Sequence, residues 1–449
     1  MIGLTLASPW ISGTLPIYSS STSSSSTTTS LSSSSFEAAN FSKPQLCPPS
    51  TSSSSSYNRR VICRSQLAND LKFLLHDALD SSGVDTTHAR AAREGFCSQI
   101  KRLSDIERHT SISINRGVDL GKTALYIAAE DDSLVSHSSV PLPVDAFIDR
   151  LDDLCMDYCS HYSASFRSSP DIFLECLERY LYVNKGFRRT NVRSQAEPRA
   201  LYLHSLHLRL GQVLTHRSGS APMLSLIYSE ILKMLRLCGL LNFDVEIFFP
   251  HDLYSLPRGY HKQRSKESDQ PHILTSQSLL LEILRNLKDA FWPFQLDHTS
   301  SLFLRAARAA NCTDRSNNVE ESGFELASAK AAQHRLERGV WTSVRFGDMR
   351  RALSACERLV LLESDLKELR DYGVLLYHCG FFEESLQYFK LYKDKKNSSI
   401  PEPSSDTFSH LEEDAVEKLI VRLNLILMEE GWTRPSYNKS FLGNNSEPW

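Results

Sequence analysis

The stretch HRSGSAPMLSLIYSEILKML, residues 216–235, decides the fold of the chain. Its first residues are polar and its remainder is an apolar run with few charges, which predicts a loop leading into a buried helix. Met223 stands near the start of that helix. Unpaired backbone N–H groups favour an anion at a helix start. The residue type at this position therefore decides whether the helix start can stabilise an anionic nucleophile.

The first 63 residues cannot form a hydrophobic core, because Ser and Thr dominate them. Up to Cys63 they hold one acid and three bases, and no base precedes Lys43. This composition predicts a plastid transit peptide over residues 1–63, cleaved near Cys63 or Arg64, and a mature protein in the chloroplast, in the stroma. A disordered tail without a targeting role is the alternative.

The remaining composition is that of a soluble, reducing-compartment protein. No uncharged apolar run is long enough to cross a bilayer, so no transmembrane segment is expected. The formal net charge of −3 gives no reason to expect a nucleic-acid partner. The ten cysteines form no CxxC pair, which favours buried, reduced thiols. Cys155 and Cys159 lie one helical turn apart; packing is preferred over a metal-binding or redox role.

Apolar spacing predicts a helical amino-terminal half. Two helices with a break at Gly83 are expected within residues 67–103, and others over residues 119–129, 144–162, 172–182 and 199–213. FDVEIFF, residues 243–249, has the β-branched and aromatic composition of a strand. Residues 257–272 predict an exposed loop. Contact with RNA or acidic partners is its alternative role, based on a basic cluster of Arg258, His261, Lys262, Arg264 and Lys266.

An internal repeat marks the carboxy-terminal part. GDMRRALSACERLVLL begins at Gly347 and GFFEESLQYFKLYKDK begins at Gly380, with Ala352 answering Ser385. A helix, a glycine turn and a helix with a small residue at the packing position are typical of tetratricopeptide repeats. About two units are too few to be stable alone, so the array must pack on the preceding domain or a partner. A last helix, with one apolar face of Val416, Leu419, Ile420, Leu423 and Leu427, is expected to cap it.

Several motifs together resemble one known family. The pattern Arg, any residue, Gly, and then Leu and an apolar run to Tyr is met at Arg217, Gly219, Leu224 and Tyr228. Gly-Phe at 186–187, Phe-Phe-Pro at 248–250 and LLLEILRNLK at 279–288 agree as well. Over residues 68–395 the chain resembles the SirB-type transglutaminase-like proteins, in which a papain-related core precedes tetratricopeptide repeats.

The resemblance implies a mainly α fold with three parts: a helical amino-terminal region, a small α+β transglutaminase-like core, and tetratricopeptide-like hairpins. The expected order is a helical and transglutaminase-like domain at 66–300, a flexible insertion at 301–324 and repeats at 325–396. A linker at 397–409, a helix at 410–431 and a disordered tail at 432–449 follow.

The catalytic residues of that family are not all present. The ungapped register places Met223 at the nucleophile position, and a thioether has no proton to lose. The family's histidine survives as His251 only if a preceding glycine has been deleted; a polar residue at a strand end is the preferred alternative. No acid follows, and the nearest string is Trp-Pro-Phe at 292–294. We therefore predict a degenerate site with no catalytic residue.

Other chemistry has weak support. No phosphate-binding glycine motif, HExxH or paired zinc doublets occur. His204 and His207 fall three apart in a predicted helix, yet without a third ligand at suitable spacing no metal or cofactor is expected. The sequence thus predicts a pseudoenzyme that binds plastid proteins through its repeats as an adaptor or assembly scaffold. The alternative is a cysteine-dependent amide hydrolase or acyl-transferase with a relocated thiol, Cys238.

Overall fold

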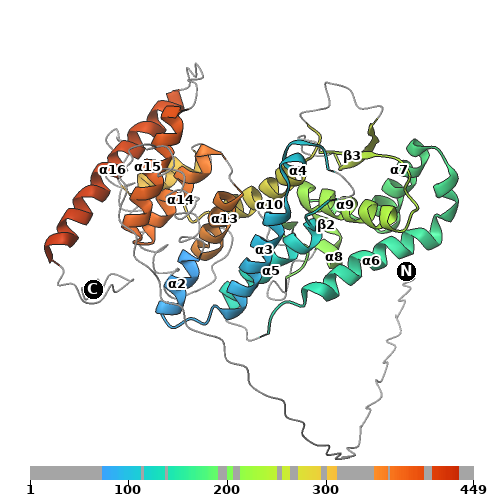
Figure 1. Ribbon diagram of the computed structural model, residues 1–449, viewed down its shortest axis with the longest axis horizontal. Coiled ribbons are helices and arrows are strands. Elements are labelled where there is room, and N and C mark those ends of the chain that lie inside the picture. Colours follow the sequence, from blue (N-terminus) through green and yellow to red (C-terminus); the bar gives the residue numbers. More distant parts are fainter. Residues whose placement is uncertain are drawn as a thin grey trace, which may run out of the picture. The chain divides into compact units, whose positions relative to one another are not determined.

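The computed structural model describes residues 73–112, 116–136, 140–190, 200–205, 213–249, 255–262, 272–294, 301–310, 348–362, 365–398 and 407–433. Helices predominate in these ranges, whose named strands form two sheets of two strands each (Figure 1). The expectation of a mainly α fold is confirmed. The predicted transit peptide and His251 lie outside the described residues.

The amino-terminal helices are α2 (Leu74–Ser81), α3 (Thr87–Arg102), α4 (Asp105–His109) and α5 (Leu120–Ser136). Gly83 has a φ of 85°, a left-handed conformation that suits glycine and separates α2 from α3 at the predicted break. Ser104 and Glu107 form a capping box at the start of α4. Helices α3 and α5 pack against each other and provide one wall of the core.

The next segment is α6 (Val144–His161), a 3-10 turn (Ser163–Arg167) and α7 (Pro170–Glu178), which continues as a π-helix (Arg179–Asn184). The helix predicted over residues 199–213 is wrong, because residues 201–205 are not helical and α8 covers only Val213–His216. The N–H groups of Val213 and Leu214 donate to the carbonyls of Tyr202 and Leu203, so these backbones pair with each other. Tertiary pairing has overridden the helical spacing.

The predicted strand is confirmed as β3 (Val245–Phe248), which pairs antiparallel with β4 (Arg258–His261). Part of the expected loop at 257–272 is therefore a strand. Its polar composition does not indicate a strand. The strand also contains Gly259, at a position where a Cβ would lie 2.5 Å from the Tyr228 hydroxyl. The remaining basic residues of that loop, Arg264 and Lys266, lie outside the described residues.

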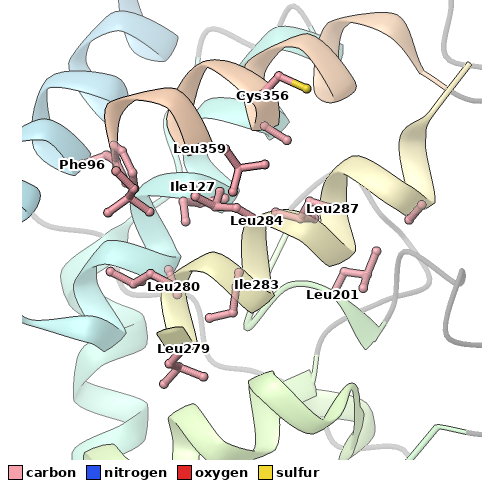
Figure 2. Close-up of a cluster of buried hydrophobic side chains, with 14 of the residues drawn as sticks. Phe96, Ile127, Leu201, Leu279, Leu280, Ile283, Leu284, Leu287, Cys356 and Leu359 are labelled. Atoms are coloured by element: carbon pink, nitrogen blue, oxygen red, sulfur yellow. The ribbon is translucent and has the colours of Figure 1, made fainter. Parts of the chain in front are cut away.

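Helix α10 (Ser276–Phe291) runs through the centre of the core (Figure 2). It packs against α5, α9 (Ala221–Leu237) and α13 (Met349–Leu361). Thr275 and Ser278 form a capping box at its start. One apolar cluster thus joins amino-terminal helices to the carboxy-terminal helices, through Phe96, Ile127, Leu201, Leu280, Ile283, Leu284, Leu287, Cys356 and Leu359.

The carboxy-terminal helices form antiparallel hairpins. After α11 (Leu302–Ala309) and α13 come α14 (Leu366–His378), α15 (Phe382–Ser398) and α16 (Thr407–Thr433). The start of α15 follows that of α13 by 33 residues, as the internal repeat predicts. The small residue Ser385 is fully buried and its hydroxyl donates to the Gly373 carbonyl at 2.7 Å, so α14 and α15 approach closely.

Helix α11 begins the segment that was expected to be a flexible insertion. Its Phe303 and Leu304 are buried, and it packs against α14 and α16. The predicted apolar face of α16 is confirmed at Val416, Leu419 and Leu423, which are buried. None of the described helices combines the length and the apolar character needed to span a bilayer.

Candidate functional site

The candidate site is the start of α9. Strand β2 (Ser218–Gly219) precedes it and pairs in parallel with β1 (Arg188–Arg189), which fixes the loop. A Cβ on Gly219 would lie 2.8 Å from a Val213 methyl group, so this position admits only glycine without a shift of Val213. Arg217 is the non-glycine residue of the described ranges with positive φ, at 54°. The backbone is therefore held in a tight turn directly before the helix.

Met223 lies in the first turn of α9 and is 2% exposed. Its thioether cannot become an anion, so the helix start has no thiolate to stabilise. The nearby hydroxyl of Ser225 is fully buried and donates to the carbonyl of Ala221 at 2.9 Å. Ser225 is therefore engaged by its own helix. Met223 and Ser225 both serve packing at this helix start.

The Trp-Pro-Phe string at 292–294, the nearest match to the acid-bearing motif that the resemblance would imply, belongs to the core. Trp292 is fully buried at the end of α10, and the Phe294 ring contacts that of His378 of α14 in a tilted arrangement, with ring centroids 4.5 Å apart. The Trp-Pro-Phe string at 292–294 thus joins α10 to the repeat helices. None of its three residues is an acid that could face the start of α9.

Four buried or partly buried cysteines of the described ranges do not supply an activated thiol in place of Met223. Burial raises the pKa of the Cys155, Cys159, Cys356 and Cys379 thiols, which disfavours thiolates. Cys238 is exposed and caps the carboxyl end of α9, about 22 Å along the helix from Met223.

His204 is a core residue. It is 5% exposed, and its ring stacks on Phe147 with centroids 3.5 Å apart. Burial, together with the Arg150 charge, lowers the pKa of His204 to about 4. His207 lies outside the described residues, whereas His216 ends α8 and is exposed. In the part of the chain that the structure describes, no group of three or more His, Cys, Asp and Glu side chains is arranged to hold a metal ion.

The most polar feature of the described core is a buried charge network between α3, α5 and α13. Arg93 is fully buried and donates to both oxygens of Glu130, at 2.8 and 2.6 Å, and to Glu357 at 2.8 Å. Ser354 accepts from Arg93 at 3.0 Å and donates to Glu130 at 2.7 Å. Arg358 pairs with Glu130 and with Asp131. This network links the amino-terminal helices to the repeat helices.

Glu130, at the centre of this network, is held as a carboxylate in the folded protein. Burial alone would raise the pKa of Glu130, yet the guanidinium groups of Arg358 and Arg93 hold it well below its ordinary value. A second link joins α10 to α14, where Lys288 donates to Glu368 at 2.6 Å and to Asp371 at 2.8 Å. Buried ion pairs of this kind tie two helical parts together, because removing one member leaves an unpaired buried charge.

Sequence reasoning missed this network. The residues that could have indicated it are the consecutive acids Glu130, Asp131 and Asp132. The helix predicted over residues 119–129 ends just before them. Helix α5 instead continues to Ser136, and all three acids are buried. Three successive acids look like a solvated helix end unless it is known that Arg93, 37 residues before Glu130, and Arg358, 228 residues after it, face them.

A scan against models of known protein families and searches of curated proteins and of solved structures found no match to the chain. The functional proposal therefore depends on the chain's own residues.

Proposed function

We propose that the protein is a non-catalytic adaptor of the plastid, which binds partner proteins through its last helix and keeps a transglutaminase-like core as a scaffold. The tetratricopeptide-like layout of the hairpins belongs to this proposal. The observation that carries it is a second apolar face on α16.

Helix α16 is apolar on two opposite sides. One side is buried, at Val416, Leu419 and Leu423. The opposite side exposes Val421 at 60%, Leu425 at 58% and Met428 at 63%. These three residues, spaced by four and three, form one stripe along the helix. We call them the α16 stripe.

An array of helical repeats usually ends in a helix with a polar outer face. The α16 stripe departs from this rule, so α16 has an apolar face beyond the one that packs on the preceding helices. Contiguous exposed apolar side chains on a soluble protein typically mark a partner site. The spacing suits a partner that presents an apolar helix face, because side chains at these intervals interdigitate with those of a second helix.

Helix α16 is held firmly enough to present the stripe. Arg370 of α14 forms an ion pair with Glu412, and Lys393 of α15 donates to Glu417 at 2.9 Å. The Arg370 guanidinium also lies 4.4 Å from the centre of the Phe303 ring of α11. Together with the buried Val416, Leu419 and Leu423, these contacts hold α16 in place, so a partner would meet a preformed surface at little ordering cost.

The non-catalytic half of the proposal is supported by Met223. The core provides no ionisable sulfur at the helix start, and burial raises the pKa of the Cys155, Cys159, Cys356 and Cys379 thiols. Removing a nucleophile lowers the rate of covalent catalysis by several orders of magnitude.

The test is quantitative affinity capture from plastid stroma with the wild-type chain and a variant in which Val421, Leu425 and Met428 are replaced by Glu. Met156→Glu is the matched control, because Met156 on α6 is 59% exposed and lies outside the repeats. We expect partners that the wild type and the control retain equally and that the α16 variant loses at least tenfold. Equal recovery by all three proteins, each with an unchanged circular dichroism spectrum, would refute the role of the stripe.

A further inference from the structure

The sheet of β3 and β4 has one face in the core and one on the surface. Side chains alternate between the two faces of a strand, and the register pairs even-numbered residues of β3 with even-numbered residues of β4. The odd-numbered Val245 and Ile247 are buried in the apolar core, so the even-numbered residues lie on the opposite face. We call this opposite face the outer face.

The outer face of β4 carries a basic and an aromatic side chain, and a second basic one follows the strand. Arg258 and Tyr260 are exposed. Lys262, directly after the strand, is exposed as well, and its N–H donates to the Asp244 carbonyl at 3.1 Å, so the pairing of the two segments extends to it. An aromatic ring thus lies between two cations.

Tyr260 is supported from the neighbouring strand. Its ring makes a T-shaped contact with that of Phe248 of β3, with centroids 5.5 Å apart. The Phe248 ring in turn lies 5.3 Å from that of His272. Among the side chains that the structure describes, Tyr260 is the only exposed aromatic one, at 38%. Its ring is therefore held by a neighbour while part of its surface remains open to a ligand.

The exposed charge of this face is positive. In the part of the chain that the structure describes, neither Arg258 nor Lys262 forms an ion pair with an acid. Burial raises the pKa of Glu178 of α7, and the Arg258 charge opposes this effect only in part. Glu246, which pairs with Tyr260 in the register, is 5% exposed. A polyanion that approaches the outer face therefore meets the two cations first.

We propose that the outer face of β4 is an interaction site for single-stranded RNA, in which Tyr260 stacks on a base and Arg258 and Lys262 contact phosphates. Stacking on an aromatic ring accepts any base, and Arg and Lys neutralise the phosphates of the same strand. The separation from Arg258 to Lys262 is about 13 Å along an extended chain, so the two side chains reach different phosphates.

The chemistry of the face favours a single strand over other polyanions. A duplex keeps its bases stacked inside, whereas unpaired loops and ends of RNA present bases that an aromatic side chain can stack on. A duplex or an acidic peptide would use the two cations and leave Tyr260 without a role. The formal net charge of −3 does not oppose the proposal, because a local cluster of cations sets the potential at its own surface.

The test is fluorescence anisotropy of a labelled, unstructured RNA of about 12 nucleotides, titrated with the full-length chain at salt concentrations of about 50 and 200 mM. We expect binding that weakens as salt rises. Tyr260→Ala weakens it by about fivefold or more, whereas Tyr260→Phe, which keeps the ring, retains it. Arg258→Ala and Lys262→Ala each weaken binding and lower the slope of log affinity against log salt by about 0.7. Lys390→Ala, at an exposed lysine of α15, is the matched control and leaves binding unchanged.

Competition with unlabelled molecules identifies the occupant. We expect single-stranded RNA to displace the probe at lower concentration than duplex RNA or poly-glutamate. Displacement by either of these as readily as by single-stranded RNA would overturn the proposal. So would the absence of binding at the lower salt, or an affinity that neither Tyr260→Ala nor Lys262→Ala changes in chains with an unchanged circular dichroism spectrum. The outer face is separate from the α16 stripe, so each of these results leaves the adaptor proposal standing.

Discussion

Replacing Arg93 by Met tests whether the buried network holds the amino-terminal helices to the repeats. Arg93 is fully buried and joins Glu130 of α5 to Glu357 of α13. The substitution keeps most of the side-chain volume but leaves two buried carboxylates with fewer partners. Removing one member of a buried ion pair typically lowers the free energy of unfolding by about 3–5 kcal/mol. We expect a loss in that range, measured by urea unfolding at pH 7.

The same helix supplies the control. Arg90 lies one turn before Arg93 and pairs with Asp77 and Asp80, but its side chain is 29% exposed. Exposed pairs contribute about 0–1 kcal/mol, so Arg90→Met should lower the free energy of unfolding by less than about 1 kcal/mol. Hydrogen exchange should also increase in α3, α5 and α13 of Arg93→Met. Equal losses for the two variants, or exchange confined to α3, would refute the linking role of Arg93.

Two further predictions concern the core. Replacing Leu284, which is fully buried in α10, by Ala should lower the free energy of unfolding by about 2–5 kcal/mol. Replacing the partly buried Leu281 by Ala should lower it less, and urea unfolding of both variants measures the difference. Burial lowers the pKa of His378 to about 4, although its ring nitrogen contacts the Ala306 carbonyl at 2.8 Å. In the unfolded chain His378 takes up a proton near pH 6.5. The stabilising contribution of neutral His378 is therefore complete above pH 6.5 and is lost as the pH falls toward 4. His378→Gln should make the urea midpoint change less with pH over that window.

The sequence predicted what depends on local pattern. Helical periodicity found α6 and the buried face of α16, and β-branched composition found β3. Glycine marked the turns at Gly83 and Gly380, where φ is positive. These signals are local because helix faces, strand composition and turn conformations each depend on residues within a few positions.

Features set by distant residues could not be predicted. Strand β4 is polar and owes its conformation to pairing with β3. Residues 201–205 are not helical, because the carbonyls of Tyr202 and Leu203 accept hydrogen bonds from the start of α8. At the candidate site, the residue type at Met223 could be read directly, whereas the hydrogen bond of Ser225 within its own helix and the contact of Phe294 with His378 of α14 could not be predicted. Such outcomes depend on which surfaces meet in three dimensions.

The most direct test of the central claim is the turnover of amide substrates by the purified chain. Glutaminyl and peptide amides would be incubated with wild type and with Met223→Ala, and release of ammonia or amine would be followed. The proposal predicts no release above the buffer rate for either protein. Turnover by the wild type that a single substitution abolishes, at Cys238 or at any other nucleophile, would contradict the claim that the core is a scaffold.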